Sequence, residues 1–452
     1  MTRNGLKRTL GLFPATNIVV ANIIGAGIFT TSGLLMADLG SPSLLIILWA
    51  VGGIIAICGA LSYGELGANM PEAGGEYMFI SKMFHPSLGF LSGWISFFAG
   101  FSAAISASAL GSAEYLIRGL PQLGFLAEHS NLINQSVLSK IIAVTIVLIF
   151  TLIHSRGIRS GTKVQNVLTV IKVAILVILI VAGLGSGMGD MSHFGQGPSI
   201  TEGKAGWKII GLSVMWIMYA YSGWNASTYI GSEIKKPGRN LPVSLLTGTG
   251  IVILLFILVN IVYIYAIPPE EMEGVISVVG LSMGKLFGRN AGIISSLVIS
   301  FALLSSLSAY IIIGPRVYYA MAKDRLFFRY VSKIHPKFNV PSRAIYLQSV
   351  VSIIIIITGT FDQIITYLGF SLGIFPILVI AGSFKLRSQK KMIIKTPGFP
   401  VPQLIYMLSG TAILILSYLE RPVESSIALI TVAAGIPAYI IFRYYYRKKE
   451  SL

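Results

Sequence analysis

Two short glycine-containing clusters have the residue types that could bind a small zwitterion. Gly25–Gly27 interrupts the first long apolar run of the sequence, and residues 221–225 (Y-S-G-W-N) interrupt the sixth. Glycine weakens a helix by about 1 kcal/mol relative to alanine, so both clusters favour local unwinding. An interrupted helix offers free amides at one end and free carbonyls at the other, which suit a carboxylate and an ammonium group. The alternative is that the glycines only permit close helix packing.

Lys172 is the most informative ionisable side chain. It lies eight positions inside the fifth apolar run, which is about 12 Å along a helix. An uncompensated lysine near the centre of a bilayer costs at least about 2.5–3.5 kcal/mol, so an intramembrane lysine is a candidate functional group. The alternative is a lysine near a helix end whose side chain reaches the headgroups.

The elements that must position these residues are membrane-spanning helices. Of the 452 residues, 54% are hydrophobic and 11% are charged, whereas a soluble domain is roughly 25% charged. Many stretches reach the length of about 20 apolar residues that a spanning helix needs, with short polar connections between them. This pattern excludes a separate soluble catalytic or DNA-binding domain.

Hydropathy and helix breakers predict an all-α integral membrane protein with 12 transmembrane helices. The third span is longer than a bilayer requires, and the polar, glycine-rich segment 72–84 after the second is compatible with a short interfacial helix. The predicted spans cover residues 12–35, 43–69, 87–118, 137–155, 164–184, 208–231, 241–266, 291–322, 344–360, 363–384, 402–419 and 424–446.

The basic residues determine the predicted orientation. With both termini cytoplasmic, the inner segments contain 25 lysines and arginines and the outer loops contain six. Such an excess on the inside is typical of multi-pass membrane proteins, so the net charge of +17 does not predict nucleic-acid binding. The first apolar run continues without a cleavage site and is interpreted as a retained helix. We expect a location in the cell (inner or plasma) membrane.

This topology gives the two glycine breaks complementary polarity. Because the first and sixth spans cross in opposite directions, the first presents amides to the middle of the membrane and the sixth presents carbonyls. A site with both fits an amino-acid zwitterion.

Four motifs carry a resemblance to a known family. They are N-I-I-G-A-G-I-F at 22–29, S-Y-G-E-L-G at 62–67 followed by P-E-A-G-G-E-Y at 71–77, Y-A-Y-S-G-W-N at 219–225, and E-I-K-K-P-G-R-N-L-P at 233–242. In order and spacing they resemble the amino acid–polyamine–organocation (APC) superfamily. More narrowly, the sequence is similar to bacterial relatives of the L-type amino-acid transporters.

The resemblance implies a LeuT-like 5+5 inverted repeat with broken helices 1 and 6, followed by two C-terminal helices. The expected divisions are a cytoplasmic N-terminus at 1–11, a first repeat at 12–184, a second repeat at 208–384, the last two helices at 402–446 and a cytoplasmic tail at 447–452.

The resemblance also implies a substrate site at the two breaks. Tyr219 would be an aromatic lid, and Trp224 and Asn225 would shape the pocket, with helix packing as the alternative role of Tyr219 and Trp224. Ala26 and Ser232 differ from the common family residues, so side-chain selectivity is not carried over. The expected substrate-binding residues are Ile23, Ile24, Gly25, Ala26, Gly27, Tyr219, Ala220, Tyr221, Ser222, Trp224 and Asn225.

By the same resemblance, the pattern Gln165, Thr169, Lys172 puts an ammonium group where sodium-coupled relatives hold a cation. Lys172 would then bridge the first and eighth spans, near Ser305 or Ser306. Two mechanisms stay open, because a buried lysine can also lose its proton. Lys172 is either a fixed charge in a sodium-independent exchanger or a proton carrier in a symporter.

Three other charged residues, Glu65, Glu233 and Arg316, lie near the predicted cytoplasmic ends of spans two, six and eight. One interpretation is an inner polar network that helps to close the cytoplasmic gate, and the other is ordinary interfacial placement. Cys58 is the only cysteine and the five histidines have no ligand spacing, so we expect neither a metal site nor a cofactor.

The leading hypothesis is sodium-independent secondary transport of small neutral L-amino acids by alternating access, with exchange placed ahead of proton-coupled symport. A polytopic membrane enzyme is a rival hypothesis, but it would need an acid, base or metal cluster at one membrane face. A sensor that binds amino acid without flux is another. The expected partners are the amino-acid substrate and the lipid bilayer, with no nucleic acid and no obligatory protein subunit.

Overall fold

The computed structural model describes the whole chain except residues 1–7, 121–134, 157, 197–205, 276 and 449–452. Most of the predicted N-terminal segment 1–11 and of the predicted tail 447–452 therefore lies outside the described residues. The described residues form helices, and their only β-type pairings are two isolated bridges, Leu10 with Ile234 and Ala73 with Ile230.

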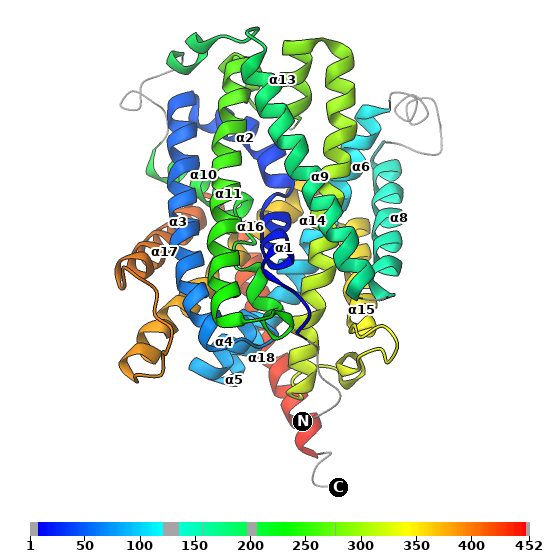
Figure 1. The fold of residues 1–452 in the computed structure, drawn as a ribbon, viewed down its shortest axis with the longest axis vertical. Coiled ribbons are helices and arrows are strands. Elements are labelled where there is room, and N and C mark those ends of the chain that lie inside the picture. The colour runs from blue at the N-terminus through cyan, green and yellow to red at the C-terminus, as the bar shows by residue number, and fades with distance from the viewer. Residues whose placement is uncertain (1–7, 121–134, 157, 197–205, 276, 449–452) are drawn as a thin grey trace.

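Long helices account for most of the chain (Figure 1). Shorter ones join them or interrupt them. In chain order the elements are α1 Leu12–Ile23, α2 Ala26–Leu39, α3 Pro42–Asn69, α4 Glu76–Met83, α5 Pro86–Ile95, η1 Ser96–Ala103, α6 Ala104–Gly119, α8 Gln135–Ser155, α9 Ile158–Gly185, η2 Met191–Gly195, α10 Trp207–Ala220, η3 Ala226–Tyr229, η4 Gly231–Glu233, α11 Pro237–Ala266, α12 Pro269–Met272, α13 Val278–Phe287, α14 Arg289–Lys323, η5 Arg329–Ser332, α15 Ser342–Thr358, α16 Phe361–Ser388, α17 Val401–Glu420 and α18 Pro422–Lys448.

Within the described residues, ten helical segments are long and apolar enough to cross a membrane. They match ten of the predicted spans, and most of their ends differ from the predicted ends by only a few residues. The other two predicted spans correspond to shorter apolar helices, α10 with 14 residues and α15 with 17. Within the predicted span 208–231, α10 ends at Ala220 and is followed by turns and 3-10 segments, so the helix is interrupted at residues 221–225, where the sequence predicted a break.

Local sequence explains several of the helix boundaries. Ser41 caps α3 by accepting a hydrogen bond from the amide of Leu44, and Pro42 occupies the first helical position, where no amide partner is needed. Thr360 and Gln363 form a capping box at the start of α16. The third predicted span is one stack of α5, η1 and α6, in which η1 is a π-helix.

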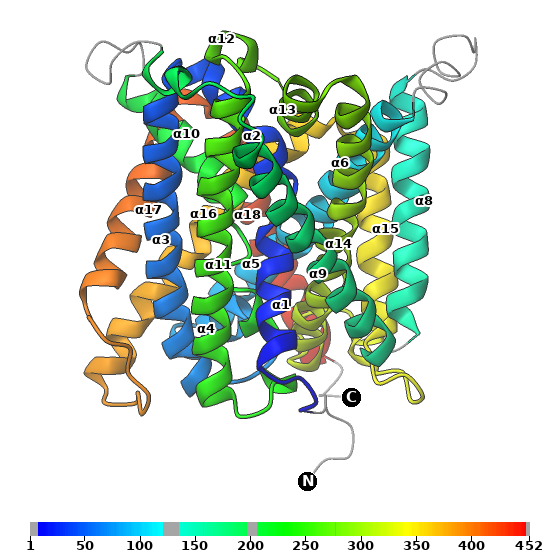
Figure 2. The same cartoon turned by 45° about the horizontal axis from the view of Figure 1, so that its top comes forward.

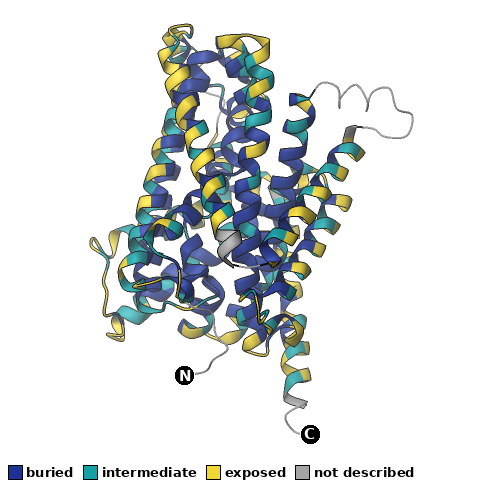
Figure 3. Ribbon diagram, turned by 45° about the vertical axis from the view of Figure 1, so that its right-hand side comes forward, coloured by how far each residue is buried: buried dark blue, intermediate teal, exposed yellow. Residues whose placement is uncertain are grey.

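Most residues of α1, α2 and α14 are buried in the bundle. The long helix α14 packs against α6 and α13, and α3 packs against α11. Figures 1 and 2 show the start of α1 and the end of α18 toward the same end of the bundle. Figure 3 shows buried residues concentrated inside the bundle and exposed residues on the outer helices.

Exposed apolar side chains on the outer helices match the lipid environment that the hydropathy predicts. Ile178 of α9, Leu408 of α17 and Ile441 of α18 are each about two thirds exposed, at 65%, 70% and 65%. Apolar surface of this kind has a favourable environment in a bilayer, and the helices satisfy their own backbone groups there.

Candidate functional site

The first break separates α1 from α2. Ile24 closes α1 by donating its amide to the carbonyl of Val20 at 2.9 Å, and Gly25 is extended, with φ −119° and ψ −158°. No side chain caps the N-terminus of α2. The first-turn amides of α2 and the positive end of its dipole are therefore offered to a ligand, and an anionic group is the ligand that they favour.

The second break follows α10. Beyond Ala220 the chain turns through residues 221–225, where Gly223 has φ +101°, a conformation that suits glycine because it lacks a Cβ. The amide of Ser222 donates to the carbonyl of Tyr219 at 2.9 Å, so this carbonyl already has a partner. The C-terminal end of α10 carries the negative end of the helix dipole, which favours a cationic group.

Glycines bring the two breaks into direct contact. A Cβ added to Gly27 would lie 2.6 Å from the Cα of Ala220 at the end of α10. A Cβ added to Gly223 would lie 2.7 Å from the Cβ of Asn22 in α1. Each break therefore supplies one glycine that lets the backbone of the other approach, and the amide end of α2 meets the carbonyl end of α10.

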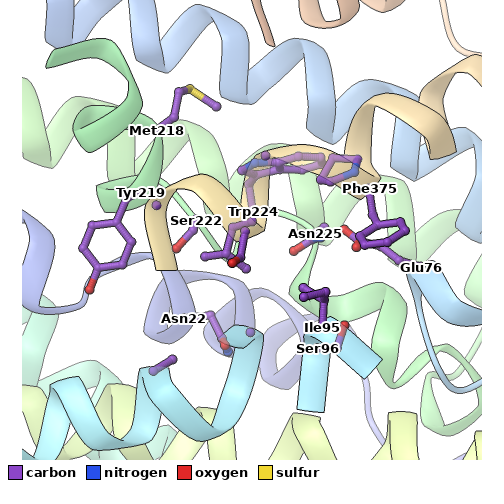
Figure 4. Close-up of a pocket in the computed structure, with 18 of the residues that line it drawn as sticks. Asn22, Glu76, Ile95, Ser96, Met218, Tyr219, Ser222, Trp224, Asn225 and Phe375 are labelled. Carbon is purple, nitrogen blue, oxygen red and sulfur yellow. Dashed lines mark hydrogen bonds between the residues drawn. The ribbon is translucent and has the colours of Figure 1, made fainter. Parts of the chain in front are cut away.

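A pocket lies beside the joined breaks (Figure 4). Tyr219, Ser222, Trp224 and Asn225, all predicted substrate residues, line it together with residues of η1, α14, α16 and α17. The remaining predicted substrate residues lie outside its lining and contribute backbone at the breaks or packing; they are Ile23, Ile24, Gly25, Ala26, Gly27, Ala220 and Tyr221.

The aromatic residues of the second break divide between the pocket and the core. The Tyr221 hydroxyl donates to the carbonyl of Trp49 at 3.1 Å, and the two rings pack edge to face at 5.6 Å. Tyr221 is thus packed against α3. Trp224 lines the pocket and also packs edge to face against Tyr63 at 4.7 Å and Tyr406 at 5.5 Å.

Several polar lining residues were not among the predicted site residues, and they include Asn22, Glu76 and Tyr310. The Tyr310 hydroxyl donates to the carbonyl of Asn22 at 3.1 Å, which ties α14 to the last turn of α1. Asn22 and Glu76 stand inside two of the recognised motifs, and Tyr310 lies one helical turn after Ser306. Their positions in or near these motifs and Ser306 were the only signals in the sequence that could have indicated a role in the pocket.

Lys172 of α9 is fully buried and its ammonium group faces the first break. It donates to the Ser306 hydroxyl at 2.8 Å, to the carbonyl of Ala21 at 3.2 Å and to the carbonyl of Ile24. Ser306 itself donates to the carbonyl of Ile24 at 2.6 Å. The ammonium thus bridges α1 and α14 through protein oxygens, and it does not extend toward a membrane face.

The neighbouring Ser305 has different partners. Its hydroxyl lies 3.4 Å from the amide nitrogen of Gln165 and 3.4 Å from the hydroxyl of Thr169. The three residues Gln165, Thr169 and Lys172 therefore all face α14, with Lys172 on Ser306 and the other two on Ser305.

Comparisons with known proteins agree with this arrangement. The family model of the amino acid permeases matches residues 10–440. The chain belongs to the amino acid permease family. It is therefore a membrane transporter and not an enzyme.

Among its relatives, the b(0,+)-type amino acid transporter 1 of Mus musculus is 28% identical over 444 residues, which cover 97% of this chain and 89% of the relative. The large neutral amino acids transporter small subunit 2 of Homo sapiens is 27% identical over 457 residues, covering 98% and 82%. The serine/threonine exchanger SteT of Bacillus subtilis (strain 168) is 27% identical over 443 residues, covering 96% and 97%.

In this permease the three charged residues of the expected inner network do not form one cluster but belong to two separate ion pairs, one of which includes Arg387. Arg316 Nε donates to Glu233 at 2.9 Å, with both side chains buried. Glu65 instead pairs with Arg387 of α16, which donates to its two oxygens at 2.7 and 2.8 Å, and it also accepts from Thr396. Arg387 was missed because nothing in the sequence near Glu65 indicates a partner 322 positions away.

Proposed function

We propose that this permease exchanges small neutral L-amino acids across the membrane by alternating access, without sodium. The observation that carries the proposal is the contact between the two broken helices beside the pocket. One break offers amides and the other carbonyls, and an α-amino acid has a carboxylate and an ammonium group on one carbon. Both the amides and the carbonyls are backbone groups, so they bind the zwitterionic part that all α-amino acids share. The side chain of the substrate is then selected by the pocket walls.

The pocket walls support a neutral substrate. Beside the polar ends, the lining includes Ile95, Met215, Met218 and Phe375. Apolar walls with a few convergent polar groups are typical of small-molecule sites, and methionine adapts to side chains of different shape. Two relatives are named for neutral amino acids and for serine and threonine, which agrees with this substrate class.

Sodium independence is supported by Lys172. Its ammonium group takes the carbonyls of Ala21 and Ile24 and the hydroxyl of Ser306 as acceptors. These are oxygen ligands of the kind that a metal cation would need, and the lysine already supplies one positive charge to them. A sodium ion could bind these oxygens only by displacing the ammonium group, and the positive charge of that group repels it.

Exchange is proposed ahead of proton symport because one relative is named an exchanger. Proton symport is the second candidate, in which Lys172 carries the proton. Uptake against a preset pH gradient, measured for the wild type and for K172A, separates the two. A wild type whose uptake ignores the gradient contradicts the symport mechanism.

We further propose twelve spans arranged as two inverted five-helix repeats, 12–184 and 208–384, followed by the two helices of 402–446. The breaks in the first and sixth predicted spans support this division. Both termini are proposed to be cytoplasmic, in the cell (inner or plasma) membrane, which the charge bias supports.

We propose that the permease needs no obligatory protein subunit, although one relative is named a small subunit. Cys58 is the only cysteine of the chain, and it is buried in α3. This sequence therefore has no cysteine in an outer loop that could form a disulfide with another chain.

The test is counterflow in liposomes that contain only the purified permease. Liposomes loaded with unlabelled serine, alanine or leucine are diluted into the labelled amino acid, once in sodium and once in choline medium. We expect accumulation of label that needs internal substrate and is equal in the two media. Binding of label without flux supports the sensor hypothesis, and the absence of both contradicts an amino-acid site.

A further inference from the structure

Glu76 is a buried acid in the pocket wall whose environment differs from that of the other buried acids. Glu65 and Glu233 each pair with an arginine. Glu76 is 7% exposed, lines the pocket, and has no ion pair among the described residues. A buried carboxylate normally needs a positive partner, so an acid with none favours taking up a proton.

The partners of Glu76 are neutral donors from α3, from the turns of the second break and from η3. One of its oxygens accepts from the Tyr63 hydroxyl of α3 at 2.9 Å and from the Asn225 side-chain amide at 2.8 Å. Tyr229 of η3 also forms a hydrogen bond with it, and Tyr406 of α17 lies within electrostatic range. The groups facing Glu76 are therefore three tyrosines and an amide, with no lysine, arginine or histidine among the interactions of the described residues.

The chain around Glu76 is joined to the segment that follows the second break. The amide of Gly74 donates to the carbonyl of Tyr229 at 3.2 Å, and Ala73 forms an isolated bridge with Ile230. Gly75 has φ +52°, and a Cβ there would lie 2.4 Å from the Tyr229 ring. Together with its hydrogen bond from Asn225, the carboxylate of Glu76 thus holds residues 73–76 against residues 225–230, and we call this set of contacts the clamp.

We propose that Glu76 is a proton-binding site in the wall of the substrate pocket, and that its protonation loosens the clamp and speeds exchange. Hydrogen bonds to a carboxylate are roughly twice as strong as those to a neutral acid. Protonation therefore weakens the hold on Asn225 and Tyr229. It also removes a buried charge that has no ion-pair partner among the described residues.

A carboxyl group ordinarily titrates far below neutral pH, but the pKa of Glu76 is raised out of that range. Burial raises the pKa of the Glu76 carboxyl to about 7, although the hydrogen bonds from Tyr63, Asn225 and Tyr229 act to lower it. Both protonation states are therefore populated near neutral pH. The proposed effect on the exchange rate does not require net proton transport across the membrane, because it depends only on whether Glu76 is protonated.

This inference rests on the proposed exchange, and its experiment keeps the two distinguishable. Exchange of labelled serine is measured with equal pH inside and outside, so that no gradient drives it. The wild-type rate is expected to fall about tenfold from about pH 6 to about pH 8, which is the change in the protonated fraction of a group with pKa near 7. A wild-type rate that stays flat overturns the proposal while leaving exchange intact.

Three variants sharpen the test. E76Q mimics the neutral acid and is expected to exchange at a rate independent of pH; persistence of the wild-type profile overturns the proposal. Y63F removes a donor to the carboxylate and is expected to move the midpoint up by about one pH unit. E72Q is the matched control, since Glu72 is exposed and pairs with Lys82 at the surface, and it is expected to keep the wild-type profile.

Infrared difference spectra of the wild type minus E76Q provide a readout that does not need transport. A protonated carboxyl signal that titrates with a midpoint near pH 7 supports the proton site even if exchange is absent. A carboxyl that is ionised throughout this range overturns it, as does an unshifted midpoint in Y63F. Stronger inhibition by lysine or arginine at high pH would assign Glu76 to a cationic substrate instead.

Discussion

Replacing Lys172 with methionine removes the ammonium group and keeps an unbranched apolar side chain as long as the lysine chain up to its Cε. The variant loses the bonds from Lys172 to Ser306, Ala21 and Ile24. The carbonyl of Ile24 keeps a donor, because Ser306 also bonds it at 2.6 Å. The carbonyl of Ala21 loses the lysine and is left buried next to the break.

The size of the effect follows from that one carbonyl. An unsatisfied buried acceptor costs about 1–3 kcal/mol, which corresponds to about 5- to 150-fold in a rate if it is felt in the step that moves the first span. Folding is expected to change less, since the variant also avoids the cost of burying a charge in the bilayer interior. K172M should therefore exchange about tenfold to hundredfold more slowly while remaining folded.

The assay is exchange of labelled serine in liposomes, with melting temperature in detergent as the check on folding. K140M is the matched control, because Lys140 donates to the carbonyl of Ile357 at an exposed position; its rate should stay within about twofold of the wild type. If K172M is folded and exchanges at the wild-type rate, the ammonium group has no role at the break and the reasoning fails.

Three further predictions concern the second break, the buried pair of Arg316 with Glu233, and Tyr219, the expected aromatic lid. G223A should abolish exchange, because φ is +101° and an added methyl group would clash with the first span, whereas G250A, with nothing within 4 Å, should exchange normally. R316M leaves Glu233 buried without its partner and should lower stability by about 3–5 kcal/mol, which thermal melting would show and E233Q in the same chain should partly restore. Y219A should raise the half-saturation concentration for serine about tenfold, measured as uptake against concentration, while Y219F should not.

Hydropathy predicted most of the helices well because the requirement to span a bilayer acts on each segment separately. Hydropathy alone shows the sixth span as one apolar run, and the glycine cluster at 221–225 was the signal for the break after Ala220, where α10 ends. Hydropathy missed α13, Val278–Phe287, in the connection between α11 and α14. Average hydropathy records the environment of a segment and carries no information on whether its backbone is continuous.

The candidate site was predictable where the signal was local and unpredictable where it was not. Glycines and a lysine inside apolar runs are visible as exceptions to their surroundings. Arg387 and Glu76 are not exceptional in the sequence, because each lies in or near a polar connection. Their importance comes from folding those connections back onto Glu65 and onto the second break, and a single sequence does not contain that distance information.

The glycines of the two breaks also show that close packing and ligand binding are not competing explanations. Gly27 and Gly223 are needed for contact between the two broken spans, because a Cβ at either would meet the other span at 2.6 or 2.7 Å. Gly25 is different: its backbone is extended, and an added Cβ would meet the Tyr310 hydroxyl at an ordinary 3.5 Å. Neither strain nor packing requires glycine there. Under the proposed function, the missing side chain of Gly25 would keep the amides of α2 accessible to the carboxylate of a substrate.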